Sequence, residues 1–218
     1  MQPFDKVQPI VILVDKSDPA AHGDAVAAAA VASVRAYAAA PDSEAWENWL
    51  YGRFTKTVRR ANPSAFERLA GEAQSGPVTV GRAKAAAFEP VRYEDMPKQL
   101  AKLQVSGTQL PEDEPAPRAE GAPLVVLNAD LQMSTGKAAA QAAHALLSWY
   151  LQLPSGAQQD WAAAGWPAAV RFTTGTRFRE LAAHPGAGPL IVDAGMTEIE
   201  PDTATAFVAP AGIGSQAA

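Results

Sequence analysis

Two short polar segments contain side chains that could do chemistry on an anionic group. In the first, Lys137, Gln141 and His144 follow one another at positions i, i+4 and i+7 of an alanine-rich segment. This spacing places all three side chains on one face of a predicted helix. Lysine is electrostatically disfavoured in the first helical turn, because the backbone dipole already makes that end positive. Lys137 therefore favours a site where two sources of positive charge act on one anion.

The second segment begins at Asp193, directly after the apolar run 189–192. An unbroken apolar run predicts a buried strand, and sites on α/β sheets commonly lie where strands end in loops. An aspartate at such a point could orient or deprotonate a water molecule. Structural interpretations stay open beside the functional ones: a solvated lysine at a helix end, an aspartate that caps a turn, and a histidine packed on the helix.

Composition excludes several kinds of catalysis. The chain has no cysteine, so disulfides, thiol nucleophiles and cysteine-ligated zinc are excluded. Its histidines His22, His144 and His184 are dispersed and show no metal-ligand spacing, so neither a metal nor another cofactor is expected. No G-x-S-x-G motif is present, so the sequence shows no serine nucleophile of that kind.

The sequence predicts a cytoplasmic protein. No apolar run is long enough to span a bilayer, and the first residues lack the basic and apolar regions of a signal peptide. No membrane contact is expected. The net charge of −5 also argues against a protein that coats nucleic acid non-specifically.

The chain contains one series of landmarks twice. Each copy has a proline and an apolar run, a polar loop, an alanine-rich helix, two tryptophans, a Val-Arg pair, a second apolar run and a Glu-Pro pair. The offset between matching landmarks drifts only from 114 residues (Pro9 to Pro123) to 111 (Pro90 to Pro201). Such an ordered series predicts an internal duplication.

Apolar runs that alternate with helices predict an α/β fold. We expect two tandem units, each a small mixed β-sheet with helices on both faces. The first covers residues 1–107 and the second 121–218, and the proline-rich acidic segment 108–120 is expected to be an exposed linker. The last strand is expected around 103–105 in the first unit and at 204–208 in the second.

Residues 127–133 and 136–145 together resemble the first signature of the type 2 (archaeal and eukaryotic-type) peptidyl-tRNA hydrolases, and residues 193–203 resemble the second. The resemblance covers Pro123 to about Pro210. It implies a four-stranded mixed sheet with helices on both sides, and hydrolysis of the ester that joins a stalled peptide to tRNA. The lysine, glutamine, aspartate and threonine of the family's signatures fall on Lys137, Gln141, Asp193 and Thr197.

The resemblance implies that water attacks the ester carbonyl. Lys137 and the helix N-terminus would stabilise the oxyanion, and Asp193 would orient or deprotonate the water. We expect His144, on the same helix face, to contact the substrate.

Several residues depart from the family's pattern. The family usually has arginine, glutamine and glycine where this chain has Met196, Glu198 and Asp202, and a basic residue where Asn128 or Ala129 stands. All these changes remove positive charge or add negative charge beside the site, although arginine is a preferred phosphate partner. They favour an alternative function, a non-enzymatic descendant that binds tRNA or a protein. The retained signature residues favour the enzyme.

The first copy lacks the residues that could do this chemistry. The positions that match the lysine, glutamine, histidine and aspartate of the second copy hold Asp24, Ala28, Val31 and Gly81. Members of the family commonly pair as homodimers. The resemblance therefore implies that the first copy is a covalently attached partner subunit, and that the chain is a monomer.

The first copy contains the densest group of basic residues. Residues 1–107 carry 13 Lys/Arg and 12 Asp/Glu, a net charge of +1, whereas residues 121–218 carry 4 and 7, a net charge of −3. The group comprises Arg53, Lys56, Arg59, Arg60 and Arg68, of which the first four are the predicted binding residues. We expect these residues to bind the tRNA backbone and supply charge that the second copy lacks; the alternative is an ordinary solvated surface.

Overall fold

The computed structural model describes residues 6–52, 54–114, 119–195 and 198–209. Its first unit has four main strands in the order β2-β1-β4-β3, with β5 paired to the other end of β1. β1 and β2 are parallel, and β4 is antiparallel to both β1 and β3. The elements are β1 (Lys6–Leu13), α1 (His22–Ala39), α2 (Glu44–Leu50), β2 (Thr55–Ala61), α3 (Pro63–Ala70), β3 (Val78–Val80), β4 (Ala83–Ala87), β5 (Val91–Arg92), η1 (Tyr93–Asp95) and α4 (Lys98–Ala101).

The second unit repeats this order as β7-β6-β9-β8. β6 and β7 are parallel, and β9 is antiparallel to both β6 and β8. The elements are β6 (Leu124–Asn128), η2 (Ala129–Leu131), α5 (Thr135–Tyr150), α6 (Ser155–Ala163), β7 (Ala169–Thr173), α7 (Gly175–Ala182), β8 (Ile191–Asp193) and β9 (Thr203–Val208). The predicted fold class, two mixed sheets in tandem units with helices on both faces, is confirmed.

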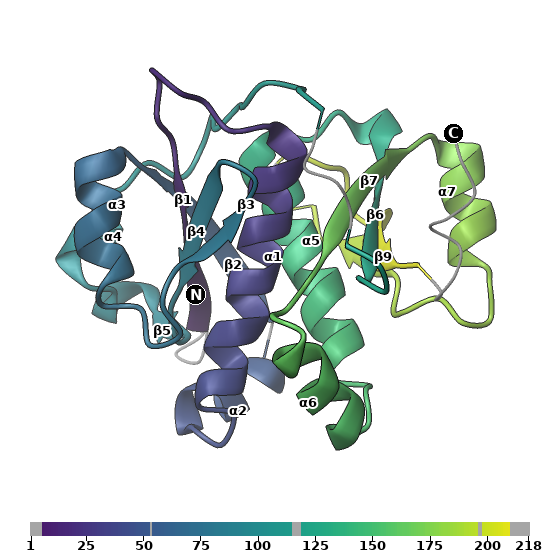
Figure 1. The fold of residues 1–218 in the computed structure, drawn as a ribbon, viewed down its shortest axis with the longest axis horizontal. Helices are drawn as coiled ribbons and strands as arrows, with labels where there is room; N and C mark the ends of the chain where they lie inside the picture. The colour runs from purple at the N-terminus through teal and green to yellow at the C-terminus, as the bar shows by residue number, and fades with distance from the viewer. Residues whose placement is uncertain (1–5, 53, 115–118, 196–197, 210–218) are drawn as a thin grey trace.

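The two sheets enclose a layer formed by α1 and α5 (Figure 1). This layer and the facing sides of the sheets form the largest core, and smaller cores lie on the outer faces, where α3 and α7 pack. Contacts join α5 to β2 and α1 to β7, so each central helix touches an edge strand of the opposite unit. The second unit's central helix is therefore bordered by residues of the first.

The central helices run side by side in the same direction. Near their N-termini His22 Nδ1 lies 3.0 Å from Thr135 Oγ1, and near their C-termini the rings of Tyr37 and Tyr150 are 6.2 Å apart. Alanines dominate the buried sides of both helices. Small side chains let helix backbones approach closely, because the distance between helix axes depends on the residues in contact.

The strand expected around 103–105 is wrong: β4 holds the place in the first sheet that β9 holds in the second, and the described strands of the first unit end with β5. The sequence of β4, Ala-Lys-Ala-Ala-Ala, has a strong preference for helix, but its alanines are buried where β4 pairs with β1 and contacts α1, and tertiary packing overrides propensity. Gln104 forms only an isolated bridge with Arg60.

The match between the two Glu-Pro pairs is also wrong. Glu89-Pro90 follows β4, whereas Glu200-Pro201 precedes β9. β3 and β4 are joined by a tight turn at Gly81, whose φ is 54°, while residues 194–202 separate β8 from β9. The sheet pairing moreover matches Asp193 with Val80 rather than with Gly81.

Part of the expected linker is packed rather than exposed. Thr108 and Leu110 are buried, and the N–H of Leu110 donates to Thr135 Oγ1 at 2.9 Å. The carbonyl of Pro111 accepts from the N–H of His22 at 2.7 Å. This segment therefore closes over the N-termini of both central helices. Within the described ranges, no helix is long and apolar enough to cross a membrane.

Candidate active site

Asp193, the last residue of β8, is the centre of a hydrogen-bonded cluster. Its side chain is only 6% exposed. Oδ2 accepts from Lys137 Nζ at 2.5 Å and from Gln141 Nε2 at 2.7 Å, and Oδ1 accepts from the N–H of Gly195 at 2.8 Å. The structure thus brings together three residues that the sequence placed in the site, and the donors fix the orientation of the carboxylate.

Gly195 and Asp202, which both lie between β8 and β9, adopt left-handed backbone conformations. Gly195 has φ 74°, and a Cβ there would lie 2.6 Å from Pro201 Cγ, so only glycine fits. Asp202 has φ 59°, and its N–H donates to the carbonyl of Asp193 at 2.8 Å. Aspartate is one of the few residues besides glycine that tolerate this conformation, which explains how it replaces the glycine that the resemblance implies.

Ser134 caps the N-terminus of α5 and connects it to the loop after β8. Its Oγ accepts from the N–H of Lys137 at 3.2 Å and donates to Glu198 Oε1 at 2.7 Å. Its own N–H donates to Glu198 Oε2 at 3.1 Å. Glu198, where the resemblance implies glutamine, therefore sets a carboxylate at the positive end of the helix, a favourable position for negative charge.

A fully buried hydroxyl, Thr205 on β9, holds Gln141. Thr205 Oγ1 donates to Gln141 Oε1 at 2.6 Å. Because the carboxylate of Asp193 only accepts, the amide NH₂ of Gln141 must face it, and the amide oxygen must face Thr205. The register between β8 and β9 shifts here, since Ile191 pairs with Ala206 and the next residue pairs with Ala204. Such a bulge re-aims a side chain, and it turns Thr205 toward α5.

The third residue of the helix row, His144, meets the first unit. Lys56 Nζ on β2 lies 3.3 Å from His144 Nδ1. The ammonium also lies over the ring of Phe54 at 4.0 Å and that of Trp49 at 4.3 Å, and the rings of Phe54 and His144 are 5.1 Å apart. Two residues expected to bind substrate, one from each unit, are therefore in contact.

Burial and positive charge both act on this pair. Burial lowers the pKa of His144 well below its ordinary value, and the charges of Lys56 and Lys137 lower it further. Burial also lowers the pKa of Lys56 well below its ordinary value, whereas the two aromatic faces favour its charged form. The imidazole of His144 is therefore neutral at ordinary pH.

Arg59 and Arg60, two other residues of the expected tRNA-binding group, do not join the site. Arg59 is buried, and its Nη1 donates to the carbonyls of Leu100, Ala101 and Leu103 at the end of α4. This geometry gives no support to a phosphate contact by Arg59. Arg60 donates to the carbonyl of Gly107 at 2.8 Å at the surface. Arg53 and Thr197 lie outside the described residues.

The corresponding region of the first unit holds no comparable polar cluster among its described residues. The positions equivalent to the four clustered side chains of the second unit are Asp24, Ala28, Val31 and Val80. Asp24 is a buried residue in the first turn of α1, where a negative charge suits the helix dipole.

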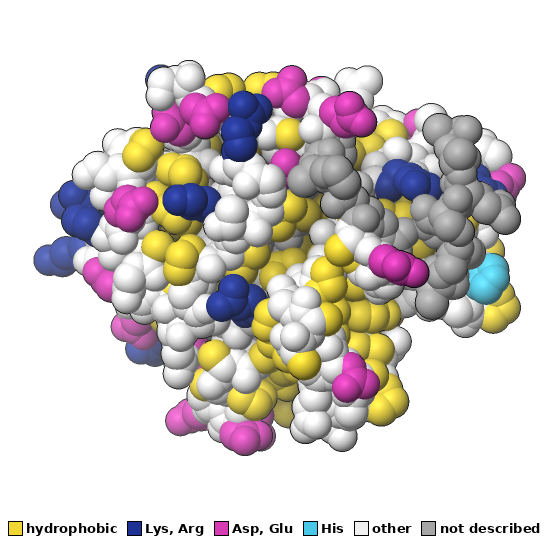
Figure 2. Space-filling model, in the orientation of Figure 1, with side chains coloured by type: hydrophobic (Ala, Val, Ile, Leu, Met, Phe, Trp, Pro, Cys, Tyr) yellow, Lys and Arg dark blue, Asp and Glu magenta, His cyan; other side chains and the backbone are white. Residues whose placement is uncertain are grey.

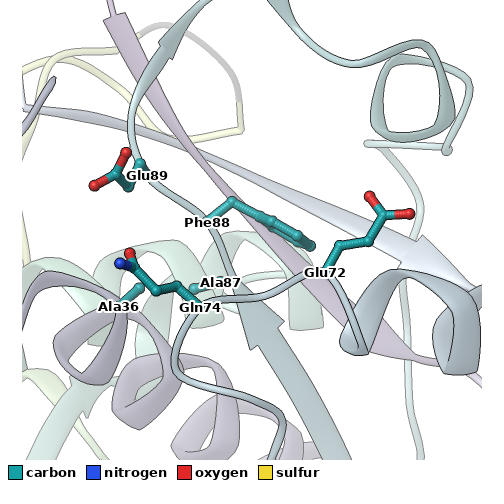
Figure 3. A pocket seen from close by; sticks show the side chains of 6 residues that line it. All are labelled: Ala36, Glu72, Gln74, Ala87, Phe88 and Glu89. Carbon is teal, nitrogen blue, oxygen red and sulfur yellow. The ribbon is translucent and has the colours of Figure 1, made fainter. Parts of the chain in front are cut away.

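The pocket drawn in Figure 3 belongs to the first unit and contains none of these residues. It measures about 210 Å³ and is lined by Ala36, Glu72, Gln74, Ala87, Phe88 and Glu89. Across the part of the chain that the structure describes, no three acidic or histidine side chains gather as metal ligands would. On the face shown in Figure 2, acidic and basic side chains are interspersed.

The family model of peptidyl-tRNA hydrolase PTH2 matches residues 123–212. The second unit is similar to this family, and the resemblance of its two signatures is confirmed in that region. The match includes α5, β8 and β9, which carry the cluster around Asp193, and it does not include the first unit. No curated protein and no solved structure matches the chain.

Proposed function

We propose that the protein hydrolyses the ester bond of peptidyl-tRNA and releases peptide and free tRNA. The observation that carries the proposal is the convergence of Lys137, Gln141 and Asp193 inside the segment that matches the hydrolase family. All three are residues of the family's signatures. Thr197, the fourth, is included in the proposal from the resemblance alone.

In the proposed mechanism, water is the nucleophile. Asp193 Oδ1 accepts a hydrogen bond from the N–H of Gly195, and a carboxylate oxygen can accept more than one, so Oδ1 can orient the water. As the ester carbonyl becomes tetrahedral, Lys137 and the N-terminus of α5 stabilise the negative charge on its oxygen. Gln141 keeps the carboxylate in place through the hydrogen bond to Oδ2.

The first unit is proposed to be a duplicated copy that serves as an attached partner subunit. The shared strand order and the parallel pairing of α1 with α5 support this idea. The face of α5 that a second copy would cover is already packed against α1 and β2. The chain should therefore be a cytoplasmic monomer, and analytical ultracentrifugation that gave a stable dimer would contradict the pseudo-dimer.

The test is release of peptide from purified peptidyl-tRNA by the wild type, Lys137→Ala and Asp193→Asn. The wild type should release peptide, and each variant should fall by at least about a hundredfold in kcat, the usual size of an electrostatic or general-base contribution. Lys98→Ala, a change at an exposed lysine of α4, is the matched control and should keep full activity. Background release by all four proteins would reject the enzyme.

One observation favours the alternative, a non-enzymatic descendant that binds tRNA or a protein. The carboxylate of Glu198 occupies the capping hydroxyl and N–H of Ser134, at the end of α5 where a phosphate of the substrate would otherwise be favoured. In that case tRNA or a protein partner would bind with equal affinity to the wild type and to Asp193→Asn, and no peptide would be released.

A further inference from the structure

We infer that Lys56, a residue of the first unit, is a positioning residue for the active site in the second. It holds His144 in the tautomer that accepts at Nδ1 and carries its proton at Nε2, so that this N–H can donate to the substrate beside Asp193. The inference rests on the proposed function. It makes the first unit a contributor to the site rather than only a support for it.

The position of His144 follows from the helix. His144 lies one turn beyond Gln141 on α5, on the face that carries Lys137. Lys137 and Gln141 both donate to Asp193, and the positive charge of Lys137 acts on His144 as well. His144 therefore continues the polar row of the site toward β2, with which α5 is in contact.

The contact itself selects the tautomer. In its charged form, which the faces of Phe54 and Trp49 stabilise, Lys56 has only donors, and its Nζ, 3.3 Å from His144 Nδ1, then meets a nitrogen that accepts. A neutral imidazole that accepts at Nδ1 carries its hydrogen at Nε2. The other ring nitrogen, Nε2, is then a hydrogen-bond donor, which suits a carbonyl, phosphate or ribose oxygen of the substrate.

The surroundings keep the ammonium in place. Lys56 lies over the faces of Phe54 and Trp49, an arrangement that stabilises a cation. Trp49 is itself fixed, because its Nε1 donates to the carbonyl of Thr55 at 2.7 Å. Phe54 has φ 55°, a left-handed conformation that is strained for a bulky residue and is found where surrounding structure demands it.

The charged groups that act on His144 come from the two elements involved, Lys56 on β2 and Lys137 on α5. Both lower its pKa, in the same direction as burial, and both therefore favour the neutral ring. The arrangement also occurs once only in the described structure. The pseudo-equivalent positions of His144 and Lys56 are Val31 and Ala168, on the side of the molecule without the polar cluster.

The test uses the full chain and the variants Lys56→Met, Lys56→Arg and the control Lys98→Met. Long-range ¹H–¹⁵N spectra of the imidazoles, assigned with His144→Gln, report tautomer and pKa without any substrate. In the wild type His144 should be neutral with its proton at Nε2. In Lys56→Met the proton should distribute over both nitrogens and the pKa should rise, because one positive charge is gone. Lys56→Arg and Lys98→Met should keep the wild-type spectrum.

The second readout is hydrolysis of peptidyl-tRNA as a function of pH. Lys56→Met should lower kcat about tenfold, the size of one hydrogen bond to the reacting complex. It should also shift the acidic limb of the pH–rate profile to higher pH. Lys56→Arg should rescue most of this loss. A purely structural lysine would not move the acidic limb.

The outcomes separate the inference from the proposed function. An unchanged His144 spectrum in Lys56→Met overturns the inference whatever the activity. A changed spectrum with unchanged kcat and pH profile also overturns it, because Lys56 would then not position the site. A wild type that releases no peptide counts against the proposed function, and the spectra alone then decide whether Lys56 sets the state of His144.

Discussion

Replacing Thr205 by valine tests how the cluster around Asp193 is held. The hydroxyl of Thr205 is fully buried and donates to Gln141 Oε1 at 2.6 Å. Valine has the same shape and no donor, so the amide oxygen of Gln141 would stay buried without its partner. Leaving a buried acceptor unsatisfied costs on the order of 1–3 kcal/mol. We expect Thr205→Val to lower the free energy of unfolding by that amount, which corresponds to roughly 2–4 °C in Tm for each kcal/mol in a chain of this size.

The same substitution should lower kcat about tenfold, because Gln141 would no longer hold Asp193 in one orientation. Chemical denaturation and peptide release measure the two effects. Thr79→Val, at an exposed position of β3, is the matched control and should change stability by less than about 0.5 kcal/mol. Thr205→Ser should restore both properties in part. The reasoning is refuted if Thr205→Val is no more destabilising than Thr79→Val.

Three further predictions concern charge. Glu198→Gln should cost about 0.3–1 kcal/mol of stability by denaturation, because the dipole of α5 loses a favourable charge, and should strengthen tRNA binding; weaker binding would contradict this. If Arg60 contacts a phosphate, Arg60→Gln should reduce the slope of log affinity for tRNA against log salt concentration by roughly 0.7–0.9. Arg59→Met should instead destabilise the fold, because Arg59 is buried against three carbonyls. The pKa of folded His144 is lowered, so the unfolded chain takes up a proton more readily: stability should fall as pH drops below about 6.5, and His144→Gln should reduce that slope in pH-dependent denaturation.

The residues around Asp193 show which parts of the site could be predicted from the sequence. Spacing on a helix predicts that Lys137 and Gln141 share a face, and an apolar run predicts that Asp193 ends a strand; their contact follows when the helix packs on that strand. The role of Thr205 could not be predicted from the sequence. A bulge between β8 and β9 turns its side chain toward α5 and breaks the alternation of side chains between the two faces that a strand otherwise shows.

The contact between Lys56 and His144 also could not be predicted from the sequence, for a different reason. Both residues had been singled out, but separately, because residues 88 positions apart meet only through the packing of α5 against β2. The strand β4 was missed because alanine favours helices in isolation and fits a strand only where a helix packs close above it.

The two units also differ in the backbone between their last paired strands, β3 and β4 in the first and β8 and β9 in the second, and we expect this difference to decide which unit can hold the site. In the first unit β3 and β4 pair without a register shift and are joined at Gly81 and Arg82. In the second, the bulge aims Thr205 at Gln141, and residues 194–202 provide both the N–H that binds Asp193 and the carboxylate that caps α5. Restoring the side chains in the first unit, with Asp24→Lys, Ala28→Gln and Val80→Asp, should therefore create no second site: the new aspartate would have neither the loop nor a threonine-held glutamine to orient it. In the proposed mechanism the first unit contributes the edge strand β2, which brings Lys56 to His144.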